Sequence, residues 1–255
     1  MELIDSHCHL DAEEFDSDRA QVVQRATVAG VVAQVVPAVT AASWPKLREV
    51  CRQHPCLHPA YGLHPVFVDQ HQDAHLAELR EWIERERPCA IGECGLDFHI
   101  EELDRERQRY VFEAQLELAA EFHLPLVIHA RRAVEDVIIA LKRIGNLRGV
   151  VHSFGGSPEQ AQQLWQLGFH IGLGGPLTYP GANRLRRLVA AIPLEQLLLE
   201  TDAPDQPDVD IRGQRNEPAR LTTILHTVAQ LRGQPAEEVA RATSENARRL
   251  FGLPC

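Results

Sequence analysis

The sequence has little of what several protein classes require. Only 5% of its 255 residues are aromatic, and no apolar run approaches the roughly 20 residues that a membrane-spanning helix needs. The N-terminal segment carries Glu2 and Asp5 where a secretory signal has a basic region followed by an apolar stretch. These absences predict a cytoplasmic protein with no membrane association.

Paired cysteines and excess positive charge are also missing. The six cysteines form no Cys-x-x-Cys pair, so we expect reduced thiols. Lys and Arg number 26 against 36 Asp and Glu, which gives a net charge of −10. Such a chain lacks the general basic surface that binds long nucleic acid by releasing counterions. Any phosphate substrate must therefore be held locally.

Eight short runs rich in aliphatic and β-branched residues are present instead. They begin near Leu3, Val31, Leu57, Cys89, Pro125, Gly149, Phe169 and Leu197. Each is followed by a stretch with helical periodicity, such as residues 104–122, and Ser157-Pro158 is typical of a helix start. Near-continuous apolar strands alternating with helices predict an α/β fold. We expect a TIM (β/α)8 barrel forming one domain over residues 1–255, with a doubly wound open sheet as the alternative.

Two histidines flank a cysteine just after the first run, in the segment Asp-Ser-His-Cys-His. Side chains alternate along a strand, so His7 and His9 are expected to project to the same side. Two-residue spacing is common by chance, and this pair alone also fits a structural role.

Four further side chains stand at or just past the ends of other runs, namely Glu93, His129, His152 and Asp202. The carboxyl ends of all barrel strands meet at one mouth, where active sites are built. These four side chains are therefore expected to meet the first two histidines. Six nitrogen and oxygen ligands without a thiolate suit two divalent ions such as Zn, Mn or Mg.

The motifs DSHCHLD, GECGLD, VIHAR, HSFGG and ETDAP, in this order and spacing, resemble the TatD family of metal-dependent hydrolases, near its YjjV-like branch. The resemblance implies a barrel of the amidohydrolase type with a binuclear metal site and deoxyribonuclease or related phosphodiesterase activity. It implies that His7, His9, Glu93 and Asp202 hold one ion. Glu93, His129 and His152 hold the other, so Glu93 bridges the two. The turn Ser153-Phe154-Gly155-Gly156 departs from the family, which often has a serine at the position of Gly155.

Two such ions would activate a water and polarise a phosphoryl oxygen. Asp202 is the expected proton acceptor as well as a metal ligand, and Glu93 is the expected bridge. Glu200 lies two residues earlier on the same strand face, where it is expected to orient a ligand histidine, with a purely structural role equally open.

Three residues are candidate substrate contacts. His64 follows the third run, Arg131 lies two residues after His129, and Arg215 lies beyond the eighth run. Because a guanidinium matches phosphate oxygens, the arginines are expected to bind a phosphodiester. Arg132 is expected to face solvent or an acidic neighbour.

The acidic chain and the absence of an evident stacking platform favour exonucleolytic action on single-stranded DNA or short oligonucleotides. No stable protein partner is evident. Two rival functions stay open. The same metals could serve an ester or amide hydrolase, for example an aminoacyl-ester deacylase, or the barrel could bind metal without catalysis.

Overall fold

The computed structural model describes residues 1–254. Cys255, the last of the six cysteines and the end of the expected domain, lies outside the described residues. The strands are β1 (Leu3–Asp5), β2 (Val31–Pro37), β3 (Leu57–Tyr61), β4 (Ala90–Asp97), β5 (Leu126–Arg131), β6 (Gly149–Val151), β7 (Phe169–Leu173) and β8 (Leu197–Leu199). The eight predicted runs therefore correspond to the eight strands.

The strands form one parallel sheet in the order β1-β2-β3-β4-β5-β6-β7-β8. A doubly wound sheet reverses its strand order at a switch point, and this order contains no reversal. The first and last strands also lie side by side, since the backbone N–H of Ser6 donates to the carbonyl of Leu199 at 3.0 Å. The sheet is thus a nearly closed barrel, which confirms the predicted fold class and excludes the alternative.

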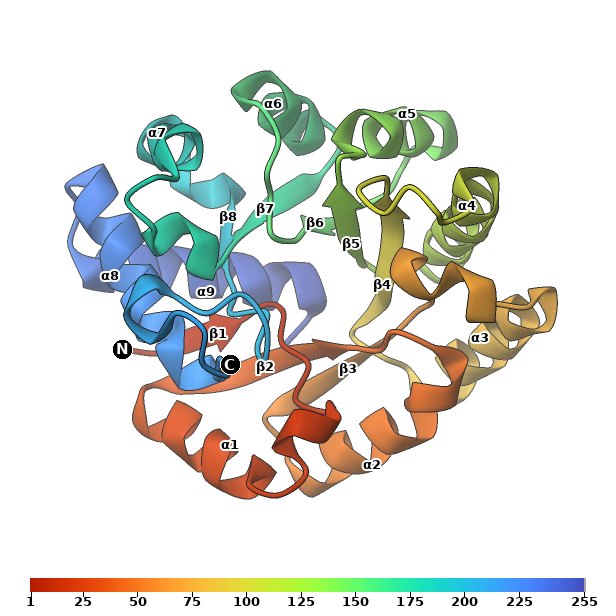
Figure 1. The fold of residues 1–255 in the computed structure, drawn as a ribbon, viewed down its shortest axis with the longest axis horizontal. Helices are drawn as coiled ribbons and strands as arrows, with labels where there is room; N and C mark the ends of the chain where they lie inside the picture. The colour runs from red at the N-terminus through yellow and green to blue at the C-terminus, as the bar shows by residue number, and fades with distance from the viewer. Residues whose placement is uncertain (255) are drawn as a thin grey trace.

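Helices surround the strands as an outer ring (Figure 1). They are α1 (Arg19–Val28), α2 (Trp44–Gln53), α3 (Asp73–Glu86), α4 (Arg105–Phe122), α5 (Val134–Ile144), α6 (Pro158–Gln166), α7 (Asn183–Ala191), α8 (Leu221–Arg232) and α9 (Ala236–Phe251). The predicted start of α6 is confirmed, because Ser157 accepts from the backbone of Gln160 while the Gln160 side chain accepts from the backbone of Ser157. No helix within residues 1–254 is both long and apolar enough to cross a membrane.

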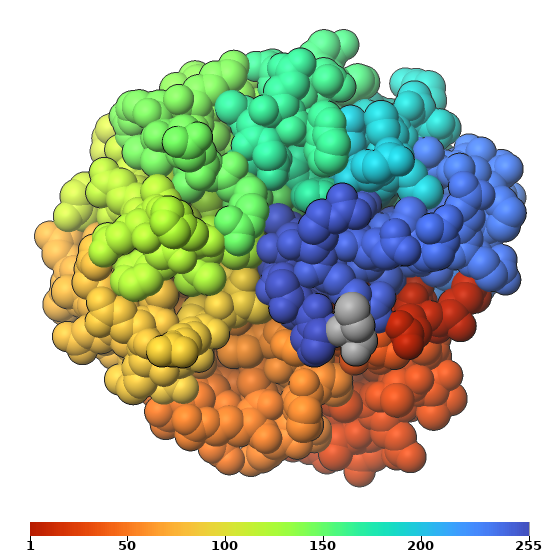
Figure 2. All heavy atoms as spheres, turned by 180° about the vertical axis from the view of Figure 1, so that it is seen from behind, coloured from red at the N-terminus to blue at the C-terminus, as the bar shows by residue number. Residues whose placement is uncertain are grey.

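Two apolar clusters hold the barrel together. The larger one fills the space between the sheet and the ring of helices. The smaller one joins residues from several strands, among them Val35, Val127 and Val150, to Leu250 and Phe251 of α9. Figure 2, seen from behind, shows the C-terminal segment lying across the centre of that face. The amino ends of the strands are therefore capped by α9, and the carboxyl ends are left for the site.

Candidate metal centre at the mouth of the barrel

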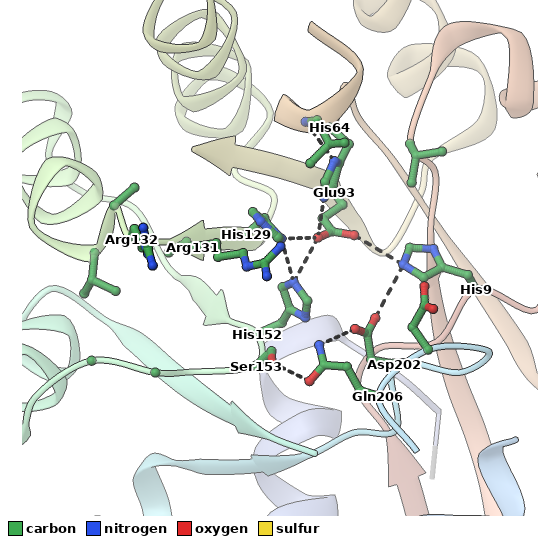
Figure 3. Close-up of a pocket in the computed structure, with 18 of the residues that line it drawn as sticks. His9, His64, Glu93, His129, Arg131, Arg132, His152, Ser153, Asp202 and Gln206 are labelled. Atoms are coloured by element: carbon green, nitrogen blue, oxygen red, sulfur yellow. Dashed lines mark hydrogen bonds and ion pairs between the residues drawn. The ribbon is translucent and has the colours of Figure 1, made fainter. Parts of the chain in front are cut away.

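Glu93 lies at the centre of the site and is only 1% exposed. Its Oε2 lies 3.2 Å from Nε2 of His7 and 3.4 Å from Nε2 of His9. Its Oε1 lies 2.9 Å from Nε2 of His152 and 3.2 Å from Nδ1 of His129. The two oxygens of one carboxylate therefore face two different pairs of histidines, and Figure 3 shows three of the four around it.

Asp202 lies just beyond β8 on the side of the first histidine pair. Its Oδ1 is 3.3 Å from Nε2 of His7 and 3.6 Å from Nε2 of His9, while its Oδ2 accepts a hydrogen bond from the side chain of Gln206. Its φ of 57° is in the left-handed region, which aspartate tolerates better than most residues. This turn directs the carboxylate into the centre.

The histidine pair is placed differently from the expectation. β1 ends at Asp5, so His7 and His9 lie in the loop beyond the strand rather than on it. Their Nε2 atoms nevertheless come within 3.1 Å of each other. Buried Asp5 fixes the start of this loop, because its carboxylate accepts from the backbone of His7 at 3.2 Å and from the hydroxyl of Thr201 at 2.6 Å. Asp5 thereby joins the end of β1 to the end of β8.

In two of the histidines, the ring nitrogen that points away from the centre lies within hydrogen-bond distance of an acceptor oxygen. Nε2 of His129 lies 2.9 Å from Oδ2 of Asp97, and Nδ1 of His9 lies 3.1 Å from the carbonyl of Pro37. A neutral imidazole that donates on its outer side keeps a lone pair on the nitrogen facing inward. Once a ring has lost its second proton, Asp97 or Pro37 therefore holds it in the tautomer that a metal ion requires.

Glu200 is fully buried behind the centre, in the position expected from its spacing. Its Oε1 accepts from the backbone N–H of Ser153 and lies 3.7 Å from Nδ1 of His152. Gly172 of β7 makes this possible, since a Cβ there would meet Oε2 of Glu200 at 2.1 Å. The carboxylate is thus positioned to orient the ring of His152.

His64 differs from the other histidines of the centre. Its Nδ1 accepts from the backbone N–H of Val66 at 3.1 Å, and its Nε2 lies 3.0 Å from Oε1 of Glu93. Burial lowers the pKa of His64 to about 4. A neutral ring whose Nδ1 accepts must carry its proton on Nε2, so His64 is a hydrogen-bond donor toward the centre.

The buried charges of the centre balance one another. Burial lowers the pKa of His9, but the hydrogen bond and charge of Glu93 and the charge of Asp202 outweigh it and raise the pKa to about 9. Burial raises the pKa of Asp202, but its hydrogen bond to His7 and the neighbouring histidines lower it to about 2. The carboxylates are therefore ionised at neutral pH, and a bound cation would take the place of the proton on His9.

The residues fit divalent cations. Three overlapping groups have ligand atoms within 4.8 Å of one another. They are His7–Glu93–His152, His7–His9–Asp202 and His64–Glu93–His129. Buried imidazole lone pairs and ionised carboxylates converging on shared points are the donor set of Zn, Mn or similar ions, and no thiolate takes part.

A cavity of about 1000 Å³ opens above the centre at the mouth of the barrel. His64 and Arg131 line it, as expected. Arg132 is exposed, as expected, but it also lines the cavity, and so does Phe67. The predicted mouth loop after β8 contributes residues 204–206. The cavity is wide enough for part of a polymer to lie across the centre.

Arg215 is not brought to this cavity. Its guanidinium donates to the carboxylate of Asp18 at 2.7 and 2.8 Å and to the backbone carbonyl of Glu14 at 2.6 Å. These three contacts hold its guanidinium away from the centre. Substrate binding by Arg215 stays a prediction without a contact to support it.

Sequence reasoning missed four residues at the site, namely Phe67, Asp97, Arg184 and Gln206. Asp97 had a signal, because it follows Glu93 by four residues on one strand and alternation places both on the same face. The other three lie in the segments after β3, β7 and β8, with Phe67 in a short 3-10 helix, Arg184 in the first turn of α7 and Gln206 in a loop. Their approach to the mouth depends on loop paths, which short-range patterns do not report.

The sequence matches the family described as TatD related DNase over residues 4–252. This chain belongs to that family. It is 40% identical over 255 residues to the metal-dependent hydrolase YjjV of Escherichia coli K12, and the match covers 98% of each chain. The predicted family is therefore confirmed, and the chain is a metal-dependent hydrolase of the TatD family, hence an enzyme.

Other members agree in sequence and in structure. The crystal structure of YjjV, described as a TatD homologue, superposes with a TM-score of 0.95 at 39% identity and covers 99% of this chain and 98% of its own. A protein of Erwinia tasmaniensis named 3'-5' ssDNA/RNA exonuclease TatD is 39% identical over 260 residues, with 98% of this chain and 100% of that protein covered.

Proposed function

We propose that this protein is a phosphodiester hydrolase that uses two divalent ions and acts exonucleolytically on single-stranded DNA or short oligonucleotides. The observation that carries the proposal is the position of Glu93, whose two oxygens face separate histidine pairs. This is the arrangement expected of a carboxylate shared by two ions. We also propose that residues 1–255 form one domain and that the enzyme acts in the cytoplasm.

The ligand sets follow from the same geometry. His7, His9 and Asp202 would hold one ion and His129 with His152 the other, with Glu93 between them. Bound there, two divalent ions supply an activated water and polarise a phosphoryl oxygen. His64 stays outside both sets, because its inward nitrogen carries a proton.

Two residues of the centre are suited to proton and hydrogen-bond work. Asp202 is ionised and lies at the cavity wall, so it can accept a proton as water attacks. Gln206 donates to its second oxygen and keeps the carboxylate oriented. Neutral His64 can donate from Nε2 to a phosphate oxygen or to the leaving group, because a lowered pKa leaves it uncharged and protonated on that atom alone.

The cavity wall supports a nucleotide substrate. Arg131 offers a planar fork for phosphate oxygens, and Phe67 offers a ring for a base, with its centroid 5.9 Å from that of His64. The name of the Erwinia tasmaniensis relative, a single-strand DNA and RNA exonuclease, points to the same class of substrate.

The test is cleavage of an end-labelled single-stranded oligonucleotide by protein stripped of metal and reloaded with Mg, Mn or Zn. We expect a metal-dependent ladder that begins at one end of the strand. Asp202→Asn should retain most of its metal but lose turnover, whereas His129→Ala should lose the second ion. Elemental analysis of each variant measures the ions directly.

Asp210→Asn is the matched control, since Asp210 is exposed and lies in the same loop as Asp202 but pairs with Arg220. It should cleave like the unmodified protein. If protein holding two ions cleaves esters or amides but no phosphodiester, the proposal is wrong and the rival hydrolase function replaces it. Full activity of Asp202→Asn would remove Asp202 from the chemistry.

A further inference from the structure

The cavity above the metal centre is positively charged on one side. Arg131 and Arg132 line it after β5, and Arg184 lines it from the first turn of α7. All three are exposed, and within residues 1–254 none forms an ion pair. Arg131 and Arg132 lie across the centre from His9 in Figure 3. Three unpaired guanidinium groups in a chain of net charge −10 form a local attraction for anions.

Two carboxylates on the same side do not cancel this charge. Asp136 lines the cavity but pairs with Arg109 at 3.0 Å. Glu135 also lines it and accepts from the side chain of Gln160 at 3.3 Å. Asp97 also faces Arg131 but is bound to His129, and exposed Glu159 faces Arg184. Three arginines against Glu135 and Glu159 leave the side after β5 and β7 positive.

The opposite side is negative. Asp11 and Glu14, in the loop after β1, line the cavity together with Asp205, in the loop after β8. Within residues 1–254 none of them forms an ion pair. Of the cations that face Asp11, His9 belongs to the metal centre, and Lys46 and Arg19 pair with Asp16. Arg215 binds the backbone carbonyl of Glu14, and its charge is paired with Asp18.

The positive side also continues outward. A hollow of about 220 Å³ adjoins the main cavity and shares Gly155, Gly156 and Arg184 with it. A Cβ built on Gly155 meets nothing within 4 Å, so the absence of a side chain there keeps the passage open. A chain that leaves the centre therefore has a path past Arg184.

We propose that the polymer part of the substrate leaves the centre over the side formed after β5 and β7, with its phosphates bound by Arg131, Arg132 and Arg184. Asp11, Glu14 and Asp205 repel further phosphates on the opposite side, so the centre cuts a strand only near its end. This inference rests on the proposed phosphodiesterase activity. It gives the exonucleolytic mode an electrostatic cause.

The phosphate charges along a strand distinguish a terminal bond from an internal one. Every internal phosphodiester has phosphates on both sides, whereas a terminal one has them on one side only. Unpaired carboxylates around the mouth raise the free energy of a phosphate placed beside them. Because Glu14 and Asp205 are exposed, this repulsion is strongest at low ionic strength. An internal bond would have to place phosphates against both sides, while a terminal bond avoids the negative one.

Binding measurements on an inactive variant test the positive side of the cavity independently of catalysis. We would measure the affinity of fluorescent decathymidylate and of the dinucleotide TpT for the metal-loaded Asp202→Asn protein, with and without Arg132→Gln and Arg184→Gln together. Each lost contact to a single-strand phosphate lowers the slope of log affinity against log salt by about 0.7, so the slope should fall by about 1.4. Decathymidylate should bind roughly tenfold more weakly, and the loss should shrink as the strand shortens to TpT.

Arg187→Gln is the matched control, since Arg187 lies on the same helix, is exposed and does not line the cavity. It should leave affinity and salt slope unchanged. Gly155→Leu gives a second probe, because it blocks the hollow in a position with open space and should fold normally. This substitution too should weaken the binding of decathymidylate more than the binding of TpT.

A comparison of linear with circular single-stranded DNA tests the negative side of the cavity. The unmodified enzyme should cut linear single strands and leave circular ones intact. Glu14→Gln with Asp205→Asn should begin to cut the circles, because phosphates can then occupy both sides. Circles cut as fast as linear strands by the unmodified enzyme would overturn the inference, and so would a double variant that gains no activity on circles.

The outcomes distinguish this inference from the proposed function. An unchanged affinity and salt slope in the arginine variants, with metal-dependent cleavage intact, would overturn the phosphate path and leave the phosphodiesterase standing. Strand binding that depends on the arginines, without cleavage by any metal form, would support the path and contradict the proposed function.

Discussion

Inward-facing residues differ in chemistry between the two ends of the barrel interior. They are apolar at the amino end, and at the carboxyl end they belong to the candidate metal centre. On β5, Val127 joins the apolar cluster at the amino end, and His129, two residues later, joins the metal centre. On β6 the same step leads from Val150 to His152. Because side chains alternate along a strand, residues two apart share a face. Barrels of this kind thus separate stability at one end from chemistry at the other.

The largest effect should come from the shared carboxylate. Glu93→Gln keeps the shape of the side chain but removes the charge that faces both histidine pairs. We expect activity to fall roughly thousandfold, equivalent to about 4 kcal/mol, and the metal content to drop. Glu237→Gln, at the exposed start of α9, is the control for a lost surface charge. A Glu93→Gln enzyme with two ions and full activity would remove Glu93 from the centre.

Substitutions at the amino end of the barrel should lower the stability of the protein without affecting metal binding. Phe251 is 5% exposed and packs with the strand residues of the smaller cluster. Phe251→Ala should lower the free energy of unfolding by about 3–5 kcal/mol, measured by denaturant titration, without changing the metal content of the folded protein. Tyr110→Ala, at a position 50% exposed, should change it by less than about 0.5 kcal/mol. Loss of metal from folded Phe251→Ala protein would break the separation between the two ends.

A smaller effect on metal binding is expected from Asp97, which lies against the outer nitrogen of His129. Asp97→Asn weakens the acceptor that holds His129 through its outer nitrogen. The metal affinity of the second ion should fall roughly 10–100-fold, measured by competition with a chelator. Asp69→Asn, an exposed substitution in the segment after β3, should leave it unchanged. Equal affinities in all three proteins would show that Asp97 does not position the ring.

The smallest effect expected is the dependence of metal affinity on pH. Without metal the pKa of His9 is about 9, so at neutral pH this ring is protonated and must lose its proton before an ion binds. The pKa values of His129 and His152 are also raised by neighbouring carboxylates. Metal affinity should therefore rise with pH by up to about tenfold per pH unit for each proton released, and level off above these pKa values. Asp202 is already ionised and adds nothing to this dependence. Chelator competition at pH 6, 7 and 8 measures it, and a flat profile would contradict the raised pKa.

The sequence predicted most of the barrel because each strand is a separate apolar run that local patterns can find. It also pointed to Glu93, His129, His152 and Asp202, since the ends of such runs meet at one mouth. It failed where position depends on loops. β1 stops at Asp5, so the convergence of His7 and His9 comes from tertiary hydrogen bonds.

The arginines give the clearest case of that failure. Arg132 and Arg184 line the cavity, although nothing in their neighbours along the chain distinguishes them from other surface arginines. Arg215 was expected at the mouth, but Asp18, almost two hundred residues away in the sequence, holds it elsewhere. Ion pairs between distant loops decide which arginines remain free, and no short motif encodes them.

The most direct test of the central claim is an anomalous-scattering map from crystals of the protein loaded with Mn²⁺. We expect two metal peaks, one between His7, His9 and Asp202 and one between His129 and His152, with a Glu93 oxygen on each. A single peak, or a second ion held by His64 in place of His129 and His152, would contradict it.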